Sequence, residues 1–103
     1  MKYCIVYSTA GSQAQADKIA AALLENRAAS CVQTAPIKSA YRWKGKIEHA
    51  DEIRLVIKTR DELYPKVEET IKSNHSYETP QIVKVGITDG LPAYLDWITE
   101  ETG

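Results

Sequence analysis

His75 and Glu78 are the side chains of this 103-residue sequence best suited to bind a metal ion. An imidazole nitrogen suits copper and zinc, and a carboxylate can complete such a site. Their spacing puts both on one side of a helical turn, and in an extended loop they can still converge. A structural metal site gathers about four ligands, so the others must come from elsewhere in the chain or from another subunit. A structural role also explains both residues, with His75 packed at a helix end and Glu78 paired with a lysine.

Cys31 is a third candidate ligand, because thiolate sulfur binds copper. The alternative is a small hydrophobic residue packed in a strand, which we favour for Cys31 and more strongly for Cys4. Both cysteines lie in apolar surroundings, which predicts reduced thiols in a cytoplasmic protein. His49 lies among other polar side chains, and we interpret it as part of a solvated strand face.

Two aromatic side chains mark the segment 39–48. Tyr41 and Trp43 are separated by one residue, so both point to one face of a strand. Lys44-Gly45 can form a hairpin turn after them, because glycine adopts positive φ without steric cost. The aromatic pair is either the wall of a ligand pocket or part of a subunit interface, and we favour the interface. A cleft at that interface, lined by Tyr41, Trp43 and Lys58, satisfies both interpretations.

Composition and motifs exclude several classes of function. The formal net charge is −1, so there is no overall attraction to nucleic acid or acidic membranes. The apolar run 3–7 is too short for a signal peptide or a membrane span, and we expect a cytoplasmic protein without nucleic-acid or membrane partners. The loop 8–12 precedes a helix but lacks phosphate-binding glycine spacing. No catalytic motif stands out, so we predict neither an enzyme nor an organic cofactor.

The elements that must position these residues form one domain, 1–103, in the order β-α-β-β-α-β with a final helix. The predicted strands are 2–8, 30–43, 46–59 and 81–87, and the predicted helices begin at Ser12, at about residue 62 and at Pro92. Both faces of strand 2–8 are apolar, which indicates a central strand. Pro36 places strand 30–43 at a sheet edge or a bulge.

Helix ends and faces can also be predicted. Ser12 and Gln15 have the spacing of a capping box, and the first helix should end near Arg27. Pro65 belongs in the first turn of the second helix, which ends at residue 73. That position of Pro65 predicts an N-cap at Asp61 or Glu62, and Asn74 is a plausible left-handed stop. The final helix has an apolar stripe formed by Leu91, Tyr94, Leu95 and Ile98.

This order predicts an α+β fold of the ferredoxin-like type. Right-handed crossovers put the first two helices on one face of an antiparallel sheet. The other face and the long hairpin then need cover. Another subunit is the simplest source of that cover.

The chain resembles the CutA family of trimeric divalent-cation tolerance proteins over nearly its whole length. The residues that carry the resemblance are Ala28–Val32, Pro36–Glu48, Glu52, Ile57–Thr59, His75, Tyr77, Glu78, Pro80 and Tyr94–Ile98. Ser76 stands where the family usually has proline, which loosens the loop that holds His75. Gln81 stands where the family usually has glutamate, which removes a carboxylate from the neighbourhood of the ligands.

The resemblance implies a ferredoxin-like fold assembled into a trimer and a link to copper and other divalent ions. Our leading expectation is a cytoplasmic homotrimer that binds Cu²⁺ or another divalent cation and contributes to metal tolerance, with His75, Glu78 and Cys31 as ligands. The trimer is similar to that of the PII signalling proteins, which implies an alternative. In that reading, a signalling or scaffold trimer binds a small anionic ligand or a partner protein at the intersubunit cleft of Tyr41, Trp43 and Lys58.

Overall fold

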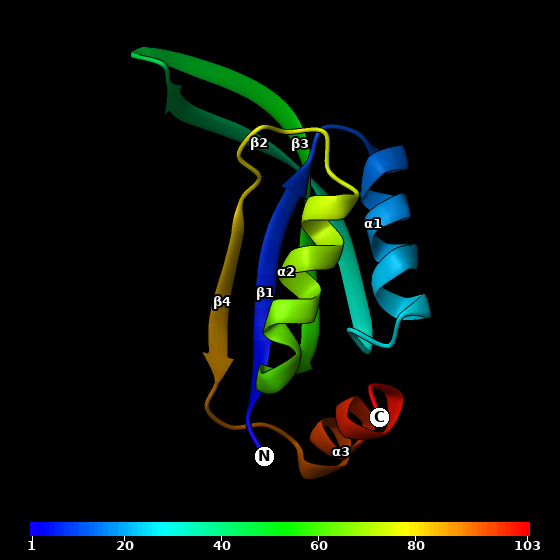
Figure 1. The fold of residues 1–103 in the computed structure, drawn as a ribbon. Helices are drawn as coiled ribbons and strands as arrows, with labels where there is room; N and C mark the ends of the chain where they lie inside the picture. The colour runs from blue at the N-terminus through cyan, green and yellow to red at the C-terminus, as the bar shows by residue number, and fades with distance from the viewer.

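The central strand of the sheet is β1, which pairs with β3 on one side and β4 on the other. The computed structural model describes all residues 1–103. Its elements are β1 (Tyr3–Ala10), α1 (Gln13–Glu25), β2 (Cys31–Trp43), β3 (Lys46–Arg60), a 3-10 turn η1 (Asp61–Leu63), α2 (Tyr64–Ser73), β4 (Ile82–Ile87) and α3 (Pro92–Glu101). All strand pairs are antiparallel, in the order β2-β3-β1-β4 (Figure 1). The predicted α+β, ferredoxin-like fold is confirmed, including the edge position of Pro36 on β2.

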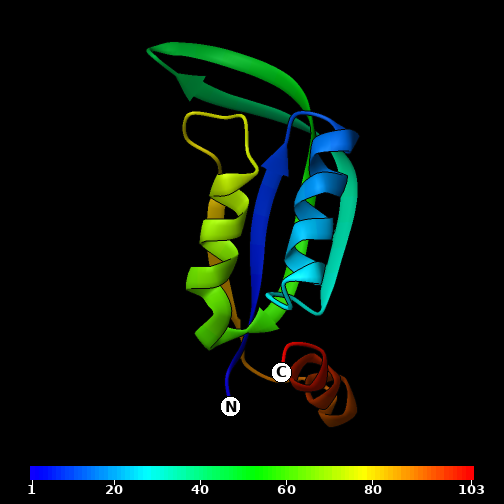
Figure 2. The ribbon, with the colours of Figure 1, turned by 45° about the vertical axis from the view of Figure 1, so that its right-hand side comes forward.

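Helices α1 and α2 lie side by side over one face of the sheet, as predicted (Figure 2). Successive side chains of a strand point to opposite faces, so every second residue meets these helices. The core between the two layers contains Cys4 and Val6 of β1, Leu55 and Ile57 of β3, Ile19 and Leu23 of α1, and Val67 and Ile71 of α2. No helix is both long and apolar enough to cross a membrane.

The opposite face of the sheet, which we call the open face, is covered only at one end. The register pairs Tyr7 with Val56 and Val83, and it pairs Ile5 with Val85, so these apolar side chains share that face. Val83 and Val85 are 48% and 52% exposed. Both faces of β1 are apolar as predicted, but α1 and α2 cover only one of them, and α3 contacts only one end of the other.

Strands β2 and β3 continue past the sheet as a two-stranded arm, residues 37–52 (Figure 1). Pairing of β1 with β3 stops at Ala10 opposite Ile53, whereas β2 and β3 stay paired as far as Trp43 opposite Lys46. Lys44 and Gly45 form the tip, with φ values of 50° and 81°. Positive φ at both central residues is the tight hairpin turn that the sequence predicted.

Three predicted helix ends differ from the structure. Neither Asp61 nor Glu62 caps α2, because both lie in η1 and Leu63 precedes the helix. The Asp61 carboxylate pairs with Lys84 at 2.9 Å, and that of Glu62 pairs with Arg60 at 2.7 Å. Asn74 is not left-handed, with φ of −117°, because its side-chain amide donates to the carbonyl of Thr70. The first helix stops at Glu25, two residues before the predicted end near Arg27.

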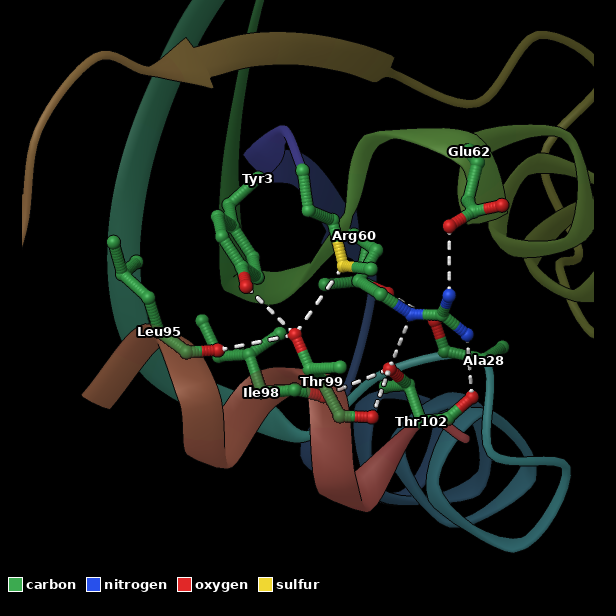
Figure 3. Close-up of polar contacts among 10 residues, drawn as sticks. Tyr3, Ala28, Arg60, Glu62, Leu95, Ile98, Thr99 and Thr102 are labelled. Carbon is green, nitrogen blue, oxygen red and sulfur yellow. Dashed lines mark hydrogen bonds and ion pairs between the residues drawn. The ribbon is translucent and has the colours of Figure 1, made fainter. Parts of the chain in front are cut away.

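Polar contacts fasten α3 to the sheet end where both termini lie (Figure 3). Tyr3 and Thr99 share a hydrogen bond of 2.6 Å, and the Arg60 guanidinium donates to both the hydroxyl and the carbonyl oxygen of Thr102 at 2.8 Å. Of the predicted apolar stripe, only Ile98 is buried, and Leu91 is 71% exposed. In one subunit, hydrogen bonds therefore position α3 as much as apolar packing does.

Candidate ligand cavity

A cavity of about 660 Å³ lies where the arm leaves the sheet. We call it the hairpin cavity. Its walls come from the arm, the end of β1 and the loop between α2 and β4. The lining residues are Thr9, Lys38, Ser39, Ala40, Tyr41, Trp43, Glu52, Tyr77, Glu78, Thr79 and Gln81.

The strand register explains how the arm contributes to this cavity. Ile37 pairs with Glu52, and paired residues of antiparallel strands point to the same face. Tyr41 and Trp43 follow Ile37 at even spacing, so they share that face with Glu52. The prediction that the two aromatics lie on one face is confirmed, and both line the cavity.

Glu52 is the most deeply placed charged group of the cavity. It is only 8% exposed, and it forms no ion pair with lysine or arginine. The hydroxyl of Tyr77 donates to its Oε2 at 2.9 Å. The other oxygen, Oε1, has no protein donor and is reached from the cavity. Glu52 therefore presents an accepting oxygen to whatever enters.

Tyr77 acts as a neutral donor toward this carboxylate. Burial, the hydrogen bond to Glu52 and the negative charge of that carboxylate together raise the pKa of Tyr77 to about 12. Each effect disfavours a phenolate beside a carboxylate. Tyr77 thus keeps its proton at every physiological pH.

His75 tethers the loop that carries Tyr77. Its Nδ1 accepts a hydrogen bond from the Tyr77 backbone N–H at 3.1 Å, which assigns the ring proton to Nε2. Nε2 donates to the carbonyl oxygen of Thr9 at 2.6 Å. Both ring nitrogens are therefore used within the subunit, and the geometry matches the structural role rather than a free metal ligand.

The predicted metal ligands do not meet in one subunit. Glu78 lines the hairpin cavity, His75 tethers the loop, and Cys31 lies at the far end of β2, paired in register with Lys58. No three His, Cys, Asp or Glu side chains of the chain come close enough to share a metal ion. A site with these ligands needs a second subunit or a rearranged loop.

Within one subunit, Lys58 lies far from Tyr41 and Trp43, so the predicted intersubunit cleft needs Lys58 from a neighbouring subunit and stays a prediction. Lys58 lies six residues beyond Glu52 along β3, about 20 Å away at the rise of a strand. Its Nζ lies 5.5 Å from the ring centre of Tyr94 in α3. The only lysine of the cavity is Lys38, which pairs with Asp51 at 3.2 Å.

Charge in the cavity favours a cation over the predicted anionic ligand. Glu52 and Glu78 contribute two carboxylates, and Asp51 already offsets the charge of Lys38. One of the two family departures lies here as well, because Gln81 lines the same cavity as Glu78. The other, Ser76, is not part of the lining and donates to the Gln15 side chain at 3.3 Å.

Sequence reasoning did not select Glu52 and Tyr77 as site residues. They are 25 residues apart, so their spacing in the sequence does not indicate that they meet. The one available signal was that both belong to the residues that carry the family resemblance.

Comparison with known proteins shows one family. The family model described as CutA1 divalent ion tolerance protein matches residues 4–101. The chain is 46% identical to the divalent-cation tolerance protein CutA of Archaeoglobus fulgidus, over 92% of this chain and 93% of that protein. It is 41% identical to the CutA protein of Thermus thermophilus, over 96% of this chain and 97% of that one.

Solved structures agree in fold. The structure described as the periplasmic divalent cation tolerance protein CutA from Archaeoglobus fulgidus has a TM-score of 0.97 at 44% identity, covering 98% of this chain and 99% of that chain. The divalent cation tolerance protein from Thermus thermophilus has a TM-score of 0.95 at 40% identity, covering 98% and 99%.

Proposed function

The chain belongs to the CutA1 divalent ion tolerance family, and on that premise we propose that it serves divalent-cation tolerance as a homotrimer that binds a small ligand in the hairpin cavity. One observation carries the proposal: the buried carboxylate of Glu52 turns a free oxygen toward a cavity walled by Tyr41 and Trp43. Small-molecule sites have volumes of roughly 300–1,000 Å³, and the hairpin cavity, at about 660 Å³, falls in that range. This is a binding role in the manner of a PII-like sensor or scaffold, without turnover.

The open face and the arm support the trimer. Val83 and Val85 expose apolar surface on the open face, and Tyr41 and Trp43 do so on the arm. A two-stranded arm is marginal in water unless another surface covers it. Light scattering should therefore give about three times the 11.5 kDa chain mass. A monomer at micromolar concentration would rule out the assembly.

The cytoplasm is the proposed compartment. Cys4 and Cys31 are both free thiols, and Cys4 is buried in the core. Reduced thiols are the usual state of cysteine in that compartment. Fractionation of cells that produce the native chain checks this, and recovery outside the cytoplasm would contradict it.

A growth experiment tests the tolerance role. Cells that lack the chain are complemented with the native protein, with Glu52→Gln or with Glu25→Gln, and are then challenged with Cu²⁺ or Zn²⁺. We expect the native chain and the α1 variant to restore growth and Glu52→Gln to fail. If a folded, trimeric Glu52→Gln variant restores full tolerance, the cavity is not required for metal tolerance.

Direct binding of copper is the second candidate. His75 and Glu78 share one loop, and Nδ1 of His75 is the ring nitrogen that carries no proton. A metal at Nδ1 displaces the Tyr77 N–H and so loosens the wall of the cavity. Such a site draws its remaining ligands, Cys31 among the candidates, from a neighbouring subunit. Copper and other divalent cations are then ligands that the protein binds directly.

A further inference from the structure

We propose that the ligand of the hairpin cavity is an organic ammonium cation, whose nitrogen lies against Glu52 and whose carbon skeleton lies against Tyr41 and Trp43. The inference rests on the proposed function only in taking this cavity as the ligand site. It names the chemical class of the ligand, which differs from both a metal ion and an anion.

The charge of Glu52 is the first argument. A carboxylate that is 8% exposed normally has a cationic partner or several donors, because desolvation of an unpaired charge is costly. Glu52 has one neutral donor, the Tyr77 hydroxyl, which leaves Oε1 without a partner. An ammonium group supplies both the missing charge and the missing donor.

The second carboxylate strengthens the same preference. Glu78 lies on the exposed rim of the cavity, so it adds negative potential at the entrance. Lys38 does not cancel this potential, because its Nζ lies 3.2 Å from Asp51. A cation is therefore attracted into the cavity and an anion is repelled.

The aromatic walls select an organic cation. The face of an aromatic ring attracts ammonium groups, with tryptophan the strongest. Trp43 already attracts one such group, since Nζ of Lys44 lies 5.7 Å from its ring centre. Tyr41 and Tyr77 add two further rings around the cavity.

Size and donor count argue against a bare metal ion as the occupant. A volume of about 660 Å³ is far larger than one ion and its ligands require. Ca²⁺ takes about six to eight oxygen ligands, and a structural Zn²⁺ site gathers about four ligands. Glu52 and Glu78 provide the only two carboxylates of the cavity, and the carbonyl oxygen of Thr9 already accepts a hydrogen bond from His75. An ammonium group, with three donors, needs fewer acceptors.

Calorimetric titration of the intact protein with three matched probes tests the class of ligand. The probes are n-butylammonium, its neutral analogue n-butanol and the anion butyrate, all at one ionic strength. We expect the ammonium ion to bind at least about tenfold more tightly than the alcohol, and butyrate not to bind. Equal binding of the ammonium ion and the alcohol, or no binding of the ammonium ion, would overturn the proposal. A cationic side chain of a neighbouring subunit that fills the cavity would also prevent the ammonium ion from binding, and the proposal would then be wrong as well.

Three variants locate the site. Glu52→Gln keeps the side-chain shape and should weaken n-butylammonium at least about tenfold, and Glu78→Gln should weaken it by a smaller factor. Glu25→Gln removes the same charge from the end of α1 and should change nothing. Circular dichroism and light scattering establish that each variant folds and assembles. If Glu52→Gln does not fold, the rim variant Glu78→Gln decides, and native affinity in it would contradict the proposal.

Failure of this inference is distinguishable from failure of the proposed function. A trimer whose Glu52→Gln variant loses metal tolerance, but which binds none of the ammonium probes, retains the proposed function and refutes the ammonium ligand. If ammonium binding depends on Glu52 but every variant restores metal tolerance, the ammonium ligand is retained and the proposed function is refuted.

Discussion

The hydroxyl of Tyr77 donates a hydrogen bond of 2.9 Å to Oε2 of Glu52, and so joins the loop after α2 to the base of the arm. Glu52 is almost fully buried there, and no lysine or arginine pairs with it. This contact holds the carboxylate in place with one oxygen and leaves the other facing the hairpin cavity. The proposed binding of an ammonium group depends on the oxygen that Tyr77 leaves without a donor.

Removing the Tyr77 hydroxyl should destabilise the protein. Tyr77→Phe leaves a buried carboxylate without its only side-chain donor, which costs about 1–3 kcal/mol. Urea unfolding at fixed protein concentration measures the loss of free energy of unfolding. Tyr94→Phe is the control, because the Tyr94 hydroxyl has no hydrogen bond in the subunit and its loss should cost little. Equal effects of the two changes would show that the Tyr77–Glu52 contact contributes nothing.

Stability should fall at alkaline pH because of the same residue. Folding raises the pKa of Tyr77 from its ordinary value of 10.0 to about 12 through burial and the nearby Glu52 carboxylate. The unfolded chain therefore loses this proton first, so the contribution is complete below pH 10 and is lost as pH rises from 10 to 12. Between pH 10 and 12, the free energy of unfolding should fall more steeply with pH for the native protein than for Tyr77→Phe. Identical slopes would contradict the raised pKa.

The turn at the tip of the arm should require Gly45. Its φ of 81° lies in the left-handed region, where a Cβ atom costs about 1–2 kcal/mol. Gly45→Ala should lower the free energy of unfolding by that amount. Gly86→Ala in β4 is the control, because Gly86 has no positive φ and an added Cβ meets no atom within 4 Å. If both variants unfold alike, the turn conformation is not the reason for glycine.

A charge on the open face should break the proposed trimer. Val85→Lys puts an ammonium group on apolar surface that another subunit is proposed to cover, and the desolvation cost disfavours assembly. Light scattering should give a smaller mass than for the native chain. Leu24→Lys makes the same change on α1, at a leucine of similar exposure on the opposite side of the sheet. A native mass for both variants would place the interface elsewhere.

Copper binding should depend on the loop after α2 if the second candidate function is correct. The double variant His75→Ala/Glu78→Ala then loses stoichiometric Cu²⁺ binding in a calorimetric titration. His49→Ala is the control, because His49 is the other histidine and lies exposed on the arm. Copper binding that survives the double variant would show that these residues do not form the site.

Much of the fold was predictable, because local patterns specify it. The two-residue period of β3, the capping pair Ser12 and Gln15 and the glycine turn at Gly45 each act within a few residues. One predicted helix end failed because a distant group intervenes, since Asp61 pairs with Lys84 instead of capping α2. The other two differ for local reasons: Asn74 donates to Thr70 four residues earlier, and Arg27 has a left-handed φ of 56° just after α1.

The sequence by itself determined the order of the elements, the position of the arm and the shared face of Tyr41 and Trp43, because backbone periodicity and turn chemistry are local properties. Only the tertiary structure decided which side chains meet. It placed Tyr77 on Glu52 across 25 residues, occupied both ring nitrogens of His75 and put Lys58 against the ring of Tyr94. Such contacts depend on strand register and on the path of a loop. The spacing of the contacting residues in the sequence determines neither of these.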